Sequence, residues 1–155
     1  MLREIMEKGY WSYYEGFDNW EDAVRAAVKP LIDKGIVKPG YANSIVEGVH
    51  KFGPYIVITK DICIPHAADA ENVNETTIAF MKTKRPVYFL GEEFPEQSSR
   101  LFFVLAACDE QKHLDNLRRL MMYLSDEEFV AKLAEAEDMD EVKKLIYQAS
   151  PMSMS

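Results

Sequence analysis

The chain has 155 residues, of which 48% are hydrophobic and 28% are charged, and its formal net charge is −8 at pH 7. This length and composition predict a single globular domain with a core of ordinary size. The acidic balance argues against a protein that binds mainly through nucleic-acid phosphates or anionic lipid, because either partner requires a basic surface.

The sequence contains no apolar segment suited to a membrane or to secretion. Its longest unbroken apolar run, Leu101 to Cys108, has eight residues, far fewer than the roughly 20 that cross a bilayer. The first residues, Met1 to Glu7, mix charged and apolar side chains and lack the apolar centre of a secretory signal. We therefore expect a cytoplasmic protein that does not insert into a membrane.

The first predicted helix covers Trp20 to Ile36. Apolar residues recur there at steps of three and four, with charged residues between them, which is typical of an amphipathic helix. Asp18 or Asn19 is expected to cap its start. Pro30 lies inside the pattern and removes a backbone donor, so we expect a kink at this point or two abutting helices.

The periodicity changes from helix to strand between Pro39 and Ile64. Pro39 suits the first turn of a second helix, which Gly53 is expected to end. Tyr55 to Thr59 then form a β-rich run. A turn at Lys60-Asp61 leads into a short strand from Ile62 to Ile64.

Three further strands are predicted in the middle of the chain. Thr76 to Met81 and Arg85 to Phe89 are interpreted as two strands, separated by the charged stretch Lys82-Thr83-Lys84. Arg100 to Ala107 is almost entirely apolar, which is typical of a strand at the centre of a sheet.

The last third of the chain is predicted to be helical. Ser125 and Glu128 form a capping-box signature for a helix over Asp126 to Ala136, and Asp138 is expected to cap a last helix over Met139 to Gln148. Residues 149–155, rich in Ser and Met, are expected to form a disordered tail. A further helix begins after Asp109, and its apolar face is expected to comprise Leu114, Leu117, Leu120, Met121 and Leu124.

This order of elements predicts an α/β fold. We expect one three-layer domain over residues 1–148, with a mixed parallel and antiparallel β-sheet and helices on both of its faces. The oligomeric state stays open, because a group of N-terminal aromatic residues is free to pack either on this domain or on a second copy. These residues are Tyr10, Trp11, Tyr13, Tyr14 and Phe17.

Among the three histidines, His66 is the first candidate for chemistry. It follows a short apolar strand, and strand ends in α/β sheets hold side chains rigidly beside an open loop. Pro65 stiffens the backbone on one side, while Ala67 and Ala68 leave room beside the ring on the other. The alternative is a loop histidine whose ring hydrogen-bonds to a backbone carbonyl.

The other two histidines lie on predicted helices. His113 falls in the first turns of the helix after the central strand, where the helix dipole and free N–H groups favour a nearby anion. A plain surface histidine is the alternative reading of this position. His50 lies on the second helix, among Gly48, Val49 and Lys51, in the manner of an ordinary helix-face residue.

Metal, redox and hydrolase chemistry find little support. No histidine pair has i, i+4 or HExxH spacing, so a zinc site would have to be assembled from distant segments. A G-x-S-x-G elbow and a Walker loop are both absent from the sequence. Cys63 and Cys108 lie among aliphatic residues, and we interpret them as small core residues, with a redox pair as the alternative.

At the level of motifs, the sequence resembles a known family. Gly53 to Ile58 running into Ile62 to Ala67 is similar to the active-site segment of the mannitol/fructose-type enzyme IIA proteins of the bacterial sugar phosphotransferase system. The resemblance covers Trp20 to Ile146, and the lead Glu47-Gly48-Val49 is most similar to the ascorbate-type branch. Further matching segments follow in the family's order: Arg85-Pro86-Val87, Leu101 to Ala107, His113-Leu114 and Leu124 to Phe129.

The resemblance implies a mannitol-type enzyme IIA fold and a phosphocarrier. The family's active histidine falls on His66, which would accept a phosphoryl group from the phosphohistidine of HPr and pass it to a cysteine of the cognate IIB protein. The second family histidine falls on His113. Mannitol-type members carry an arginine where this chain has His50, which would donate one hydrogen bond to the phosphoryl group instead. A membrane IIC permease is implied as an indirect partner.

The physical chemistry of such a transfer is compatible with these residues. A neutral imidazole attacks in line when its second nitrogen is held by an acceptor, and no metal or other cofactor is required. We expect a shallow apolar surface around His66 to meet both protein partners in turn, with Phe52, Tyr55 and Ile64 as candidate members.

Two biological roles stay open from the sequence. The first is uptake and phosphorylation of a sugar, for which similarity to the ascorbate-type branch indicates an ascorbate-like substrate. The second is a regulatory relative that is phosphorylated at the same histidine and controls a transcription factor or another enzyme.

Overall fold

The computed structural model describes residues 1–149, so the expected disordered tail lies, apart from Ala149, outside the described residues. The helices are α1 (Leu2–Lys8), α2 (Trp20–Asp33), α3 (Pro39–Phe52), α4 (Glu110–Leu124), α5 (Glu127–Glu135) and α6 (Met139–Gln148). The strands are β1 (Trp11–Tyr14), β2 (Val57–Thr59), β3 (Asp61–Cys63), β4 (Thr77–Tyr88) and β5 (Ser98–Ala106). Two short 3-10 turns, Ala70–Asn72 and Pro95–Gln97, precede β4 and β5.

One mixed sheet forms the middle layer. Its strand order is β1-β4-β5-β3-β2, which places β5 at the centre, as its apolar composition predicts. β5 pairs antiparallel with β4 and parallel with β3. β1 joins β4 in parallel, and β2 joins β3 antiparallel.

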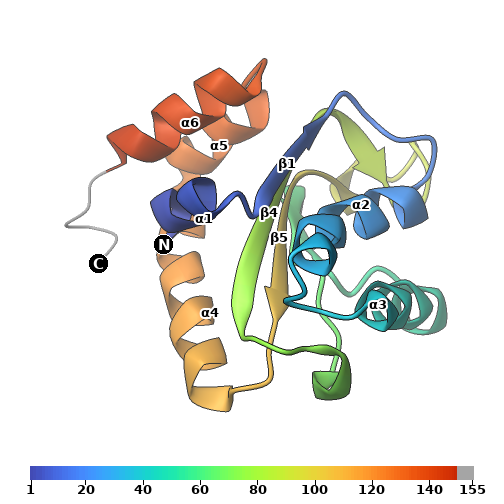
Figure 1. The fold of residues 1–155 in the computed structure, drawn as a ribbon. Coiled ribbons are helices and arrows are strands. Elements are labelled where there is room, and N and C mark those ends of the chain that lie inside the picture. Colours follow the sequence, from blue (N-terminus) through green and yellow to red (C-terminus); the bar gives the residue numbers. More distant parts are fainter. Residues whose placement is uncertain (150–155) are drawn as a thin grey trace.

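Helices cover both faces of this sheet, which confirms the predicted three-layer α/β fold. α2 and α3 pack on one face, and α1, α4, α5 and α6 pack on the other (Figure 1). Successive residues of a strand point to opposite faces. Accordingly, Phe102 and Val104 of β5 belong to the core under α2 and α3, whereas Leu101 and Phe103 belong to the core under the other helices.

Of the two alternatives predicted at Pro30, a kink or two abutting helices, the structure excludes the second, because α2 is a single helix. It runs unbroken from Trp20 to Asp33, and the Asn19 side chain caps its start by accepting the Asp22 N–H at 2.8 Å. Val28 and Leu31, on either side of Pro30, are both fully buried. Their burial stabilises the continuous helix against the loss of one backbone hydrogen bond.

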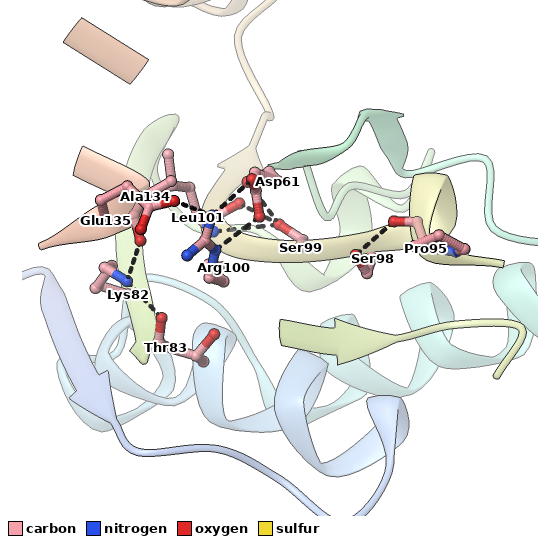
Figure 2. A network of polar contacts seen from close by, with 10 residues as sticks. All are labelled: Asp61, Lys82, Thr83, Pro95, Ser98, Ser99, Arg100, Leu101, Ala134 and Glu135. Atoms are coloured by element: carbon pink, nitrogen blue, oxygen red, sulfur yellow. Dashed lines mark hydrogen bonds and ion pairs between the residues drawn. The ribbon is translucent and has the colours of Figure 1, made fainter. Parts of the chain in front are cut away.

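The two strands predicted around Lys82-Thr83-Lys84 are one strand, β4. Lys82 lies opposite Tyr13 of β1 and opposite Leu101 of β5, and Thr83 lies opposite Tyr14 of β1. The register with β5 shifts between Lys82 and Val87, so the predicted break appears as an irregularity within one strand. The ladder hydrogen bonds override the charged side chains that suggested a break. The Lys82 side chain is fully buried, and its Nζ donates to the carbonyl oxygens of Thr83 and Ala134 (Figure 2).

An ion-pair network lies beside Lys82 at the start of β3. Arg100 donates to both carboxylate oxygens of Asp61, at 2.9 and 3.0 Å, and to Glu135 at 3.0 Å (Figure 2). Such a two-point guanidinium–carboxylate contact fixes orientation as well as distance. It anchors the beginning of β3, the strand whose other end leads to His66.

Burial lowers the pKa of Lys82 to about 8, and the nearby Arg100 guanidinium acts in the same direction. Between about pH 8 and the ordinary lysine pKa near 10, the unfolded chain keeps a proton on Lys82 that the folded protein has lost. The free energy of unfolding therefore rises with pH across this range. We expect wild type to gain about 1–2 kcal/mol of unfolding free energy relative to Lys82→Met between pH 8 and pH 10. Urea unfolding of both proteins across this range measures the gain, and parallel pH curves would contradict it.

The N-terminal residues form elements that the sequence pattern did not indicate. α1 buries Leu2 and Ile5 against the α4–α6 side of the sheet. Trp11 and Tyr13 belong to β1, an edge strand, so these two aromatic residues pack on their own domain.

Three details of the C-terminal half differ from expectation. Asp126 rather than Ser125 caps α5, because its carboxylate accepts the Phe129 N–H at 3.1 Å. Leu114 and Met121 were expected on the buried face of α4, but both are exposed. Cys63 is buried as predicted, whereas Cys108 is exposed because it lies in the connection between β5 and α4.

None of the helices in residues 1–149 combines the length and the apolar character that a bilayer crossing requires.

Candidate functional site

His66 lies where the chain leaves the sheet after β3. The Ile64 N–H donates to the Ile56 carbonyl at 2.7 Å, and the Leu105 N–H donates to the Pro65 carbonyl at 3.0 Å. These bonds continue the pairing of β3 with its two neighbours by two residues. The prediction of a histidine held at a strand end is thereby confirmed.

The imidazole of His66 has one nitrogen engaged by the backbone. Its Nδ1 lies 2.7 Å from the Ile64 carbonyl oxygen. Because a carbonyl only accepts, this contact places a proton on Nδ1, and in the neutral tautomer the lone pair is then on Nε2. The ring also meets the Tyr55 ring edge-on, with 5.2 Å between centroids and an interplanar angle of 89°. The half-buried imidazole is thus held by its backbone contact and by Tyr55, and Nε2 is the ring nitrogen that the Ile64 carbonyl does not engage.

His66 and His113 line the same hollow, which has a volume of about 470 Å³. A second, more open hollow of about 700 Å³ adjoins the first on the side of α3. Both hollows include His66, Ala67, Ala68 and Asp69, so the histidine lies between them. The first is completed by Tyr41, Ala70, Leu105, Ala107 and His113, and the second by Ser44, Gly48, Phe52 and Tyr55.

His113 is held on the first turns of α4. Asp109 caps this helix by accepting the Lys112 N–H at 3.2 Å. The approach to the helix is fixed by Thr76, whose hydroxyl accepts the N–H groups of Cys108 at 2.9 Å and Asp109 at 2.8 Å. Because Asp109 occupies the Lys112 amide, that donor of the helix start is not free for an anion in the hollow.

His50 does not join the other two histidines. Its Nε2 lies 3.3 Å from the Glu21 carboxylate, and its ring packs on Trp20 of α2 at 4.8 Å between centroids. Successive helix residues are about 100° apart, so His50 lies roughly 200° around α3 from Gly48, which lines the second hollow. The expectation that His50 would contact a phosphoryl group on His66 therefore finds no support in this geometry.

Asp69 is a member of the site that the sequence pattern did not indicate. Its carboxylate accepts hydrogen bonds from Ser44 and from Asn72, at 2.5 and 2.7 Å, which lower its pKa below the ordinary value. An anion therefore borders both hollows near neutral pH. Aspartate in a loop of this kind carries no spacing signal in one sequence, so only the fold reveals it.

The three residues expected on the partner-facing surface differ in their exposure to solvent. The Phe52 side chain is 71% exposed at the end of α3, and Tyr55 is partly exposed beside it. Ile64 is buried in the core under α4–α6 and is therefore excluded from such a surface.

In residues 1–149, no three His, Cys, Asp or Glu side chains converge in an arrangement suited to a metal ion.

Comparison with known proteins gives consistent matches along nearly the whole chain. Residues 4–149 match the family described as phosphoenolpyruvate-dependent sugar phosphotransferase system, EIIA 2. The ascorbate-specific PTS system EIIA component of Shigella dysenteriae serotype 1 (strain Sd197) is 29% identical over 130 residues, which cover 83% of each protein.

Two solved structures share the fold. The mannitol-specific cryptic phosphotransferase enzyme IIA CmtB of Escherichia coli superposes with a TM-score of 0.78 at 22% identity, covering 89% of this chain and 92% of that one. A chain from the complex of IIA mannitol with phosphorylated IIB mannitol of Escherichia coli superposes with a TM-score of 0.69 at 24% identity, covering 87% and 93%.

Proposed function

Because the chain belongs to the EIIA 2 family of the phosphoenolpyruvate-dependent sugar phosphotransferase system, and is thus a phosphotransferase acting between proteins, we propose that His66 carries its phosphoryl group. In this proposal His66 receives the group from the phosphohistidine of HPr and passes it to a cysteine of a IIB protein. The observation that carries the assignment is that His66 and His113 line one hollow. The 2.7 Å contact from Nδ1 to the Ile64 carbonyl agrees with it, because Nε2 is then the nitrogen available to react.

Phosphoryl transfer depends mainly on the correct position of the nucleophile and on stabilisation of the transferred group's charge, and less on covalent chemistry by the protein. The Nε2 lone pair forms the new N–P bond while the N–P bond of the donor histidine breaks. The proton stays on Nδ1, and the ring becomes positively charged next to the Ile64 oxygen, which stabilises that charge. In the onward step a cysteine thiolate of the partner attacks phosphorus, and Nε2 leaves with its electron pair.

We propose that His113 donates a hydrogen bond to the transferred group, which carries a charge of about −1.5 to −2 by analogy with other phosphorylated side chains. Its presence in the same hollow as His66 supports this role. Asp109 occupies the Lys112 amide, so the imidazole is a donor from this helix start that does not depend on that amide. His50 has no part in the proposal, because it is engaged by Glu21 and Trp20.

Phe52 is proposed to contact the protein partners, because a side chain of this size that is 71% exposed beside the histidine offers an apolar anchor. Phe52→Ala is expected to raise the KM for phosphorylated HPr or for the IIB acceptor by roughly tenfold, as for an interface hot spot. Thermal stability should change little, since most of the Phe52 side chain is exposed to solvent. The matched control is Leu90→Ala, which removes an exposed apolar side chain outside both hollows. Equal effects from the two variants would exclude a specific contact at Phe52.

The transport role is proposed for an ascorbate-like sugar acid. This rests on the relative with 29% identity that is described as ascorbate-specific. The sugar itself meets the membrane partner and not this chain, so the IIB protein is the correct probe. The purified phosphorylated protein is mixed separately with the IIB protein of an ascorbate system and with that of a mannitol system. We expect it to transfer its phosphoryl group faster to the ascorbate IIB protein. Equal transfer to both, or none to either, would contradict the ascorbate assignment.

The phosphocarrier assignment is tested by incubating the protein with phosphoenolpyruvate, enzyme I and HPr and measuring its intact mass. We expect one added phosphoryl group, lost in acid, as is usual for a phosphohistidine. Omission of HPr should prevent the modification. An acid-stable group, or labelling without HPr, would contradict the assignment.

A further inference from the structure

Two tyrosine hydroxyls hold the peptide group that follows His66. The Tyr55 hydroxyl donates to the His66 carbonyl oxygen at 2.5 Å. The Tyr41 hydroxyl accepts the Ala67 N–H at 3.2 Å and donates to the Leu105 carbonyl at 2.5 Å. Both polar atoms of the His66–Ala67 peptide group are therefore bound by phenols from outside the strand.

The peptide groups before His66 are fixed by different means. The Pro65 ring restricts its own φ angle, and the Pro65 carbonyl accepts the Leu105 N–H. Tyr41 bonds to the carbonyl of the same Leu105, so β5 holds the segment on both sides of the histidine. The Ile64 carbonyl then meets Nδ1 only if the backbone angles of Pro65 and His66 stay within a narrow range.

We propose that Tyr41 and Tyr55 are positioning residues for phosphoryl transfer. They fix the peptide group after His66, and this keeps Nδ1 hydrogen-bonded to the Ile64 carbonyl. Nε2 then stays unengaged and oriented for attack on the phosphoryl group. This inference rests on the proposed role of His66.

The surroundings of both phenols suit this task. Burial raises the pKa of Tyr41 to about 12, so its hydroxyl keeps its proton throughout the physiological range. Tyr55 packs against Gly48 of α3, where an added Cβ would lie 3.1 Å from the Tyr55 hydroxyl oxygen and 3.3 Å from its ring. A glycine at this point lets the phenol reach the His66 carbonyl.

The test compares Tyr41→Phe, Tyr55→Phe and the double variant with wild type, using two measurements. Long-range ¹H–¹⁵N correlation spectra of the unphosphorylated protein above pH 8 report the His66 tautomer. Steady-state phosphorylation by HPr reports kcat and KM separately. We expect the variants to lose the pure Nδ1–H tautomer, and the double variant to lose about tenfold in kcat with KM within twofold, which corresponds to about 1.4 kcal/mol of transition-state stabilisation.

Tyr13→Phe is the matched control, because its hydroxyl also donates to a backbone carbonyl, that of Glu137 at 2.9 Å, but not near the histidine. It should keep both the tautomer and kcat even if stability falls. Gly48→Ala displaces Tyr55 without removing a hydroxyl and is expected to act in the direction of Tyr55→Phe. This variant keeps the proposal testable if the double variant does not fold.

An unchanged tautomer in all Tyr41 and Tyr55 variants would overturn the positioning role, and so would an unchanged kcat. Failure of the proposed function looks different. Wild type would then take no phosphoryl group on His66, while the tautomer measurement would still report whether the two phenols hold the ring.

Discussion

Replacing His66 with alanine is expected to abolish phosphoryl uptake from HPr, with a loss of at least about 10³-fold, since removing a nucleophile leaves no group that forms the intermediate. The side chain is half-buried and its ring contacts chiefly Tyr55 and its own backbone, so the fold should survive the change. Intact mass after incubation with phosphoenolpyruvate, enzyme I and HPr gives the result directly.

The control for this variant is structural. Thermal unfolding and the amide NMR spectrum should match wild type away from residues 64–67, so that the loss of label is chemical. A phosphoryl group that persists on the His66→Ala protein, at His113 or elsewhere, would refute the assignment of His66.

The second large effect is expected at His113. His113→Ala should still accept a phosphoryl group, but transfer to the IIB protein should slow by about 10- to 100-fold. The loss of one donor that stabilises developing charge costs about 10²–10³ in enclosed sites, and the hollow here is open to solvent. Rapid-quench measurement of the decay of the phosphorylated protein after mixing with IIB protein isolates this step.

His113→Gln is the informative partner variant, because its amide keeps a hydrogen-bond donor but has no titrating imidazole. If hydrogen bonding is the function of His113, the His113→Gln variant should transfer its phosphoryl group to the IIB protein at close to the wild-type rate. If alanine and glutamine slow transfer equally, the imidazole has another role, and wild-type rates from both would mean that His113 has no role in transfer.

A carrier must hold its phosphoryl group only moderately, and the charges around the hollow fit this requirement. Asp69 places an anion beside His66, held by Ser44 and Asn72. Asp109 occupies one of the amides at the start of α4. Both features weaken the stabilisation of a doubly charged group, which favours its departure to the next protein.

Structural features that are determined by neighbouring residues in the chain are predictable from the sequence. Pro65 and the short strand before it act within a few residues, so the placement of His66 at a strand end is predictable. For the same reason Asp138 caps α6 as expected, and α2 is capped by Asn19, one of the two residues proposed for that position. The overall α/β architecture also follows from the order of periodic segments.

Other features depend on contacts between distant segments, which one sequence does not reveal. The charge of Lys82 suggested that the strand is interrupted there. Its backbone nevertheless pairs with β1 on one side and with β5 on the other, so Lys82 belongs to β4. The side of α3 that bears His50 is decided by how α3 packs on α2. Tyr41 has the spacing of a core residue, and its hydroxyl acquires a role only because Leu105 and Ala67 lie beside it.

The central claim, that Nε2 of His66 carries the phosphoryl group, is tested most directly by long-range ¹H–¹⁵N spectra of histidine-labelled protein before and after phosphorylation by HPr. We predict that only the His66 ring changes substantially, with the modification on Nε2 and the proton retained on Nδ1. Modification of Nδ1 of His66, or of the ring of His113 or His50, would contradict the account.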